Sequence, residues 1–279
     1  MGSEKEEKLY TLKRVEAYDG GIGAFAARPI ACGEVILREA PLVRCTLETL
    51  DASMQALDEG ARRRFFSLCD WRATASAQPK TALGVFQSNG YPCGDDAGVF
   101  LAFARFNHSC SPNVSHKFDG TDRFVFAARA IAAGEELCTT YAALALPRAA
   151  RRSLLSGVFG FDCSCACCGL ENAALAASDV RRQRIAALDD SIFALASKGR
   201  YADAVVDARE RLSLLTTEGL GTPENLLRTA HDALQASDHA GDAAAQAEWL
   251  AKVISWTKLC VPETSPDHEA LRTALAALA

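Results

Sequence analysis

Apolar and polar residues alternate along several short stretches in the first part of the chain. The period of two is clear over residues 8–15, and residues 33–45 have the pattern of a further pair of strands. Residues 113–118 and 123–130 are two more such stretches, and the Asp119-Gly120 pair between them is typical of a hairpin turn. Many short strands with few helices predict an irregular β core rather than parallel βαβ units.

Helical spacing of apolar residues dominates two other regions. Residues 46–70 have this spacing and predict a helical insert over about 46–85, and a short helix at 147–160 begins with Pro147, which suits a first helical turn. After residue 172, Ala, Leu, Asp and Arg dominate the composition. Five helices are expected there, at 178–198, 201–217, 223–239, 242–259 and 267–279.

These patterns predict an α+β first domain at 1–172 and an α-helical second domain at 173–279. Paired helices of this length resemble tetratricopeptide-type hairpins, although a strict repeat of about 34 residues is absent. A plain helical bundle fits the pattern equally well.

The overall charge argues against two classes of partner. The 279 residues carry a formal net charge of −5, which disfavours a broad electrostatic grip on nucleic acid or on an acidic membrane. No apolar run approaches the roughly 18 residues of a membrane span, and the charged start MGSEKEEK has no apolar segment behind it. We therefore expect a cytoplasmic or nuclear protein, monomeric, with no membrane partner.

A dense group of cysteines is the strongest chemical signal. In a reducing compartment the 11 cysteines should be thiols, and a tight cluster indicates a metal site. Cys163, Cys165 and Cys168 have the spacing C-x-C-x-x-C, which suits tetrahedral zinc. Cys110 in the NHSC stretch is the best candidate for the fourth ligand; the other candidates are Cys167, His108 and His116. The alternative is a loop of unligated cysteines.

Four motifs occur in an order that resembles a known family. They are Gly21-Ile22-Gly23, NHSCSPN at 107–113, GEELCTTY at 134–141 and FDCSCACC at 161–168. The series resembles the SET-domain protein lysine methyltransferases, in particular the SET-and-MYND group, over about residues 9–170. The resemblance implies a knotted SET core and a tail after it that holds one structural zinc. It also implies methyl transfer from S-adenosylmethionine to the side-chain amine of a lysine in a histone or another protein substrate.

The resemblance also assigns roles to individual residues. Tyr141 matches the catalytic tyrosine, and Phe159 falls where many relatives carry a second tyrosine of the lysine channel. If Phe159 replaces that tyrosine, the channel has more room and one fewer hydrogen bond to the amine, which would favour a second or third methyl addition. The cofactor-binding positions implied are Gly21, Ile22 and Gly23 as a turn, Asn89, Asn107, His108, Tyr141, and Phe161 stacked on adenine.

Some features depart from the family or favour other functions. The cysteine-rich MYND insert is absent, because only Cys45, Cys69 and Cys93 lie between residues 44 and 100. Phe159 leaves open a catalytically weak or inactive scaffold that binds partners through its helical domain. A thiol enzyme using His108 and Cys110 is disfavoured by their closeness in sequence. A nucleic-acid-binding zinc module is disfavoured by the acidic charge.

Overall fold

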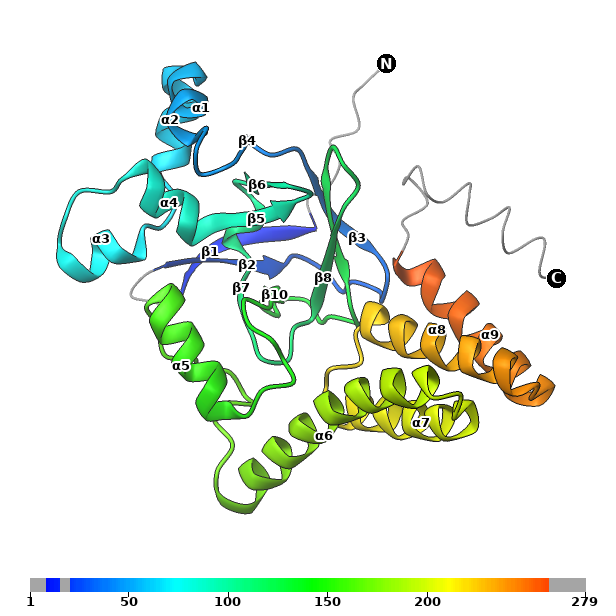
Figure 1. Cartoon of the computed structure of the whole chain (residues 1–279). Coiled ribbons are helices and arrows are strands. Elements are labelled where there is room, and N and C mark those ends of the chain that lie inside the picture. Colours follow the sequence, from blue (N-terminus) through cyan, green and yellow to red (C-terminus); the bar gives the residue numbers. More distant parts are fainter. Residues whose placement is uncertain (1–8, 16–20, 261–279) are drawn as a thin grey trace.

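In the computed structural model, the described residues are 9–15 and 21–260, and they form a mixed α/β structure with a helical C-terminal region (Figure 1). Its strands are short and belong to four small sheets. The strands are β1 (Tyr10–Val15), β2 (Gly21–Ala26), β3 (Val35–Glu39), β4 (Val43–Cys45), β5 (Gly90–Cys93), β6 (Asp96–Val99), β7 (Asn107–His108), β8 (Val114–Phe118), β9 (Arg123–Ala127) and β10 (Cys138–Thr139). The expected irregular β core is thus confirmed.

Antiparallel pairing dominates these sheets. β1 pairs with β2, β9 lies between β3 and β8, and β6 lies between β4 and β5, while β7 and β10 pair in parallel. The expected hairpin joins β8 and β9, and the Asp119 carboxylate accepts the N–H groups of Thr121 and Asp122 at 2.9 and 2.8 Å. Gly120 has φ of +102°, a conformation that costs glycine little. This hairpin is therefore confirmed.

A phenylalanine-rich core holds the sheets together. Phe100, Phe103 and Phe106 are fully buried and pack with Val125 of β9 and with Leu137. The short 3-10 helix η2 (Phe103–Arg105) leads directly into β7. Burial of these rings therefore fixes where β7 begins.

The predicted helical insert consists of four short helices. They are α1 (Leu50–Ala56), α2 (Glu59–Phe66), α3 (Trp71–Ser76) and α4 (Ala82–Asn89). The chain breaks at Leu57, which is extended, and Asp58 caps α2 by accepting the N–H of Ala61 at 2.7 Å. Asp70 caps α3 in the same way. These caps mark the starts of separate helices within the predicted helical insert.

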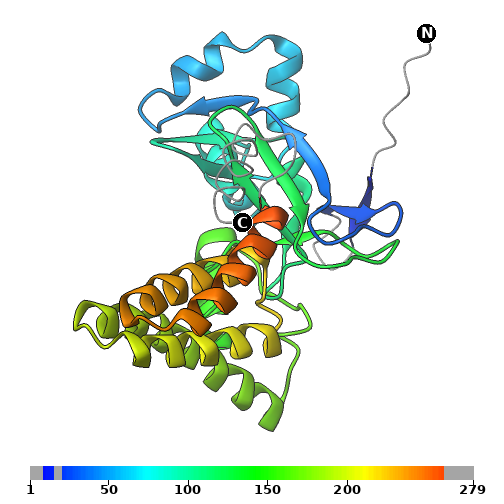
Figure 2. The ribbon, with the colours of Figure 1, turned by 90° about the vertical axis from the view of Figure 1, so that its right-hand side faces the viewer.

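Four of the five expected tail helices are present. They are α6 (Asn172–Ser197), α7 (Tyr201–Thr217), α8 (Pro223–Ala240) and α9 (Ala243–Cys260), and the expected helix at 267–279 lies outside the described residues. Each helix packs against the next, and small buried residues such as Ala208 and Ala233 let them approach closely. The tail helices and the insert lie at opposite ends of the β region (Figure 2). None of the helices described has the length and apolarity of a membrane span.

Along the chain, α5 (Arg148–Phe159) follows the β region and precedes the tail. It begins directly after Pro147, which is its N-cap residue. It ends at Gly160, whose φ is +72° and whose added Cβ would lie 2.3 Å from a ring carbon of Trp71. Gly160, at the end of α5, thus lies in close contact with Trp71 of the insert helix α3. Because only glycine avoids both the strained φ and the overlap, this position cannot hold a side chain without local rearrangement.

We therefore expect Gly160→Ala to lower the free energy of unfolding by about 2–4 kcal/mol. The matched control is Gly157→Ala in the same helix, where an added Cβ meets nothing within 4 Å. That change should stabilise the chain by about 0.5–1 kcal/mol, because alanine is the better helix former. Urea unfolding of both variants measures the difference, and equal effects would contradict the assignment.

Candidate active site and metal centre

The parallel pairing of β7 with β10 brings two distant motifs together. Asn107 lies opposite Cys138, and His108 lies opposite Thr139. The NHSC stretch is therefore next to the GEELCTTY stretch, although about thirty residues separate them along the chain. Asn113 fixes the returning loop: its side chain donates to Glu136 O at 2.8 Å and accepts the N–H of Cys138 at 2.7 Å. Asn113 therefore ties the loop after β7 to the backbone at Glu136 and Cys138.

Asn107 meets the first motif through an acidic partner. Its Nδ2 donates to Glu136 Oε1 at 2.8 Å, and a Cβ on Gly23 would lie 2.6 Å from that oxygen and 2.9 Å from Nδ2. The Gly21-Ile22-Gly23 segment is not the expected turn: it begins strand β2 and pairs with β1. Its interior glycine is therefore needed for space beside Asn107, not for an unusual φ.

Tyr141 is held at both its ends. Its hydroxyl donates to the carbonyl of Phe106 at 2.9 Å, and its backbone N–H donates to His108 Nδ1 at 3.0 Å. Its ring lies 5.1 Å from that of Phe159 and meets that of Phe161 edge-on at 6.4 Å, measured between centroids. Because the left-handed Gly160 turns the chain after α5, Phe159 and Phe161 both reach Tyr141.

His108, Tyr141, Phe159 and Phe161 thus form one aromatic cluster. His108 is buried, and the other three are half-buried. Since His108 Nδ1 accepts a hydrogen bond, its Nε2 carries the proton and donates to Cys110 Sγ at 3.3 Å. Burial lowers the pKa of His108 to about 4, with Cys165 opposing and Arg151 adding to the shift. The imidazole is therefore neutral at pH 7 and links the aromatic cluster to the cysteines.

Asn89, expected to bind the cofactor, makes its side-chain hydrogen bonds within the insert region. It ends helix α4, and its amide donates to the carbonyls of Cys69 and Val85, both at 2.7 Å. Neither hydrogen bond reaches the aromatic cluster. Asn89 therefore has a clear structural task at the end of the insert, whatever further role it has.

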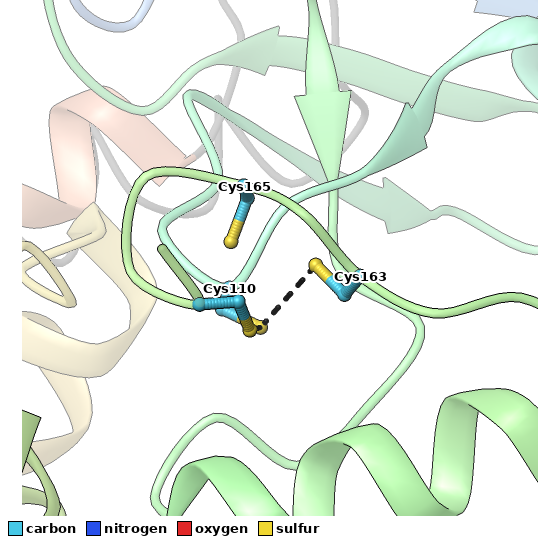
Figure 3. Close-up of side chains that lie close together, drawn as sticks. Cys110, Cys163 and Cys165 are labelled. Carbon is cyan, nitrogen blue, oxygen red and sulfur yellow. Dashed lines mark hydrogen bonds between the residues drawn. The ribbon is translucent and has the colours of Figure 1, made fainter. Parts of the chain in front are cut away.

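The sulfurs of Cys110, Cys163, Cys165 and Cys168 all lie within 4.8 Å of one another. Cys110 Sγ is 4.0 Å from Cys163 Sγ and 3.6 Å from Cys168 Sγ. Figure 3 shows the sulfurs of the three labelled cysteines turned toward a common point. Zn–S bonds of about 2.3 Å in a tetrahedron place sulfurs about 3.8 Å apart, so the group can hold zinc.

The other candidate ligands lie outside this group of four sulfurs. Cys167 is not part of it. His116 is on β8, where its Nδ1 is 2.6 Å from Arg123 Nη1 and its ring packs on Phe103.

His108 and Cys110, the pair considered for a thiol enzyme, do come within hydrogen-bonding distance, contrary to the expectation from their closeness in sequence. Cys110 is fully buried, however, which argues against attack on a substrate.

Three residues of this region were not expected from the sequence. Glu136 bonds Asn107, Arg151 contacts the cysteine sulfurs, and Arg182 of α6 donates to Cys110 O at 3.1 Å. Glu136 stands within the GEELCTTY motif, so its position was a usable signal. The arginines lie in helices rich in arginine, where nothing in the spacing distinguishes a buried one from an exposed one.

The protein-family model described as "SET domain" matches residues 21–142, which span β2 to the residue after Tyr141. Residues 21–142 form a SET domain. Gly23, Asn107 and Tyr141 all lie inside this SET domain, whereas Phe159, Phe161 and three of the four clustered cysteines follow it.

Similar proteins are named as lysine methyltransferases. Histone-lysine N-methyltransferase set5 of Schizosaccharomyces pombe is 33% identical over 193 residues, covering 66% of this chain and 58% of that protein. N-lysine methyltransferase SMYD2-B of Danio rerio is 32% identical over 101 residues, 34% of this chain and 23% of that protein. Histone-lysine N-methyltransferase SMYD3 of Mus musculus is 37% identical over 71 residues, 25% and 17% respectively. The chain thus matches only 58% of the first relative's length.

The environment of His116 predicts a pH effect on stability. Burial, helped by the charge of Arg123, lowers the pKa of His116 to about 4 from 6.5. Between pH 6.5 and pH 4, His116 is therefore protonated in the unfolded chain but neutral in the folded chain. The stability present above pH 6.5 is lost as the pH falls toward 4. We expect His116→Gln, which keeps an acceptor for Arg123, to remove about 2.5 kcal/mol of this loss at pH 4.5. Urea unfolding at pH 7 and 4.5 measures it, and equal losses in both proteins would contradict the assignment.

Proposed function

We propose that the chain transfers a methyl group from S-adenosylmethionine to the side-chain amine of a lysine in a protein substrate, histone or non-histone. The observation that carries this function is the meeting of three segments at one place. Gly23 touches the Asn107–Glu136 pair, and Asn107 is followed by His108, which binds the backbone of Tyr141. This place lies in a SET domain whose relatives are named as lysine methyltransferases.

The cofactor would be held by residues that surround Gly23. A side chain at Gly23 would fill the space beside Asn107 and Glu136, so the glycine keeps backbone and amide groups open to a ligand. The residues proposed to hold it are Gly21, Ile22, Gly23, Asn89, Asn107, His108, Tyr141 and Phe161. When bound, S-adenosylmethionine supplies a sulfonium methyl group.

The chain itself must hold the amine of the substrate lysine in its neutral form and in line with that methyl group. Free lysine titrates near 10.4, and a dry, aromatic channel beside a cation favours the neutral amine. The hydroxyl of Tyr141 donates to Phe106 O, which supports its proposed role of orienting the amine. Catalysis would then be mainly alignment. Phe159 packs on Tyr141 and brings no hydroxyl, which leaves more room at the amine and favours a second or third methyl.

The four clustered cysteines are proposed to hold one structural zinc. The separations of 3.6 and 4.0 Å from Cys110 Sγ support tetrahedral thiolate ligation. This zinc would fix Phe159 and Phe161 near Tyr141, because the 163–168 loop follows them directly. It takes no part in the transfer itself.

Finer features belong to the same proposal. We propose a knotted crossing in the SET core, a division of the chain near residue 172, a monomeric state and a place in the cytoplasm or nucleus. Tetratricopeptide-like pairing of the tail helices is supported by their short connections at Gly199, Gly219 and Gly241.

A second candidate function is binding of protein partners by the tail, with weak or absent turnover. A cavity of about 600 Å³ lies among the tail helices α6 to α8. Its lining includes Asp190, Phe193 and Asp232, together with the Asp189–Arg228 ion pair. Phe193 is 77% exposed, which is unusual for so large an apolar side chain. Acidic and aromatic groups together suit a basic segment of a partner.

Tyr141→Phe tests the proposed function. Loss of one positioned hydroxyl should lower the rate of methyl transfer about 10²-fold while cofactor binding is retained. Transfer of labelled methyl groups to histones and to other lysine-rich proteins measures the rate, and calorimetry measures cofactor binding.

The matched control is Tyr201→Phe in the tail, which should transfer methyl groups at the wild-type rate. A Tyr141→Phe variant that keeps the full rate would contradict the role of this hydroxyl. Cofactor binding by the unaltered chain without transfer to any lysine protein would favour the second candidate.

A further inference from the structure

Arg151 of α5 is fully buried against the clustered cysteines. Its Nε lies 3.2 Å from Cys110 Sγ, its Nη2 lies 4.0 Å from Cys168 Sγ, and its Nη1 donates to the carbonyl of Leu146. In the described part of the chain, no carboxylate lies within ion-pair distance of this guanidinium. The sulfurs are therefore the groups positioned to balance its charge.

Three more arginines surround the same group through its backbone. Arg148 Nη1 donates to Cys168 O at 3.1 Å, and Arg152 Nη2 donates to Cys163 O at 3.1 Å. Arg182 Nη2 donates to Cys110 O, also at 3.1 Å, and its Nε is paired with Glu218 at 2.9 Å. Each of these cations thus contacts the backbone of a clustered cysteine.

Burying a guanidinium without a counter-charge costs free energy, so the groups around it indicate how its charge is balanced. The other arginine without a carboxylate in the core, Arg123, is surrounded by the rings of Tyr91, Phe100, Phe103 and Phe118 at 4.7–5.9 Å. Arg151 has no such ring contact in the described structure. Four thiolates around a divalent cation carry a net charge of about −2, which matches a cationic neighbour at hydrogen-bonding distance.

We propose that Arg148, Arg151, Arg152 and Arg182 form a cationic shell that holds a divalent metal in the cysteine cluster. Arg151 is its central positioning residue, because it is the one of these four arginines that donates to the sulfurs. Its N–H groups stabilise the thiolates and orient Cys110 and Cys168, as outer partners of metal ligands commonly do. This inference rests on the proposed zinc.

The shell also connects the metal to the tail. Arg182 belongs to α6, and its partner Glu218 accepts from Arg181 and Ser178 as well. The backbone of Cys110 is therefore bonded to a buried ionic network of the helical region. Loss of the metal would leave this network facing uncharged thiols, so metal release and loosening of α6 should occur together.

Arg151→Met tests the shell, because methionine has a similar length and no charge. The zinc-loaded protein is mixed with a chromogenic chelator, and the rate of zinc transfer is measured together with the zinc content per chain. We expect Arg151→Met to release zinc at least about 10-fold faster than the unaltered protein. Arg151→Lys keeps the charge but loses the fork of donors, so its release rate should be intermediate.

The control is Arg184→Met, since Arg184 lies on the surface of α6 and pairs with the exposed Glu210. It should release zinc at the wild-type rate. Cobalt-loaded protein gives an independent readout, because altered hydrogen bonds to sulfur shift the sulfur-to-cobalt charge-transfer band in the Arg151 variants and not in the control.

The outcomes separate the shell from the zinc proposal. If Arg151 only fills space, methionine leaves the release rate unchanged and stability equal or higher, and the shell is overturned. If Arg151→Met does not fold, Arg151→Lys decides, and wild-type release with an unshifted cobalt band overturns it. An unaltered protein that binds no metal overturns the zinc proposal itself.

Discussion

The approach of Cys110 to the 163–168 loop is the contact on which the site depends. It connects the loop after β7 to a segment more than fifty residues later, across the end of α5. Phe159 and Phe161 stand immediately before that segment, so the chain links the position of the sulfurs to that of these rings. The aromatic cluster around Tyr141 and the sulfur cluster are therefore one packed unit.

Arginines from both halves of the chain contact this unit. Arg151 reaches the sulfurs from α5, and Arg182 reaches Cys110 from α6, with Glu218 of the tail as its counter-ion. Buried ionic groups of this kind give little net stability but penalise any arrangement that separates them. They explain how a helical region with its own core stays attached to the β region at the side of the cysteines.

Motif spacing predicts much of this architecture, because glycine, proline and cysteine constrain the chain locally. The β8–β9 hairpin follows from Asp119-Gly120, and the sulfur group follows from C-x-C-x-x-C with a second cysteine in NHSC. The Gly21-Ile22-Gly23 segment is a strand because pairing with β1 decides its conformation, and that pairing is not visible in a three-residue motif. Glu136 and Arg151 acquire their tasks only through contacts made by the folded chain.

In the proposed function, closure of the sulfur cluster assembles the cofactor site. Calorimetric titration of S-adenosylmethionine into zinc-loaded and zinc-depleted samples of the same protein tests it most directly. We expect binding to the loaded protein, with one zinc per chain, and a loss of affinity of at least about 10-fold on depletion. Equal affinity in the two samples would contradict it, because the aromatic cluster would then be shown to form without the metal.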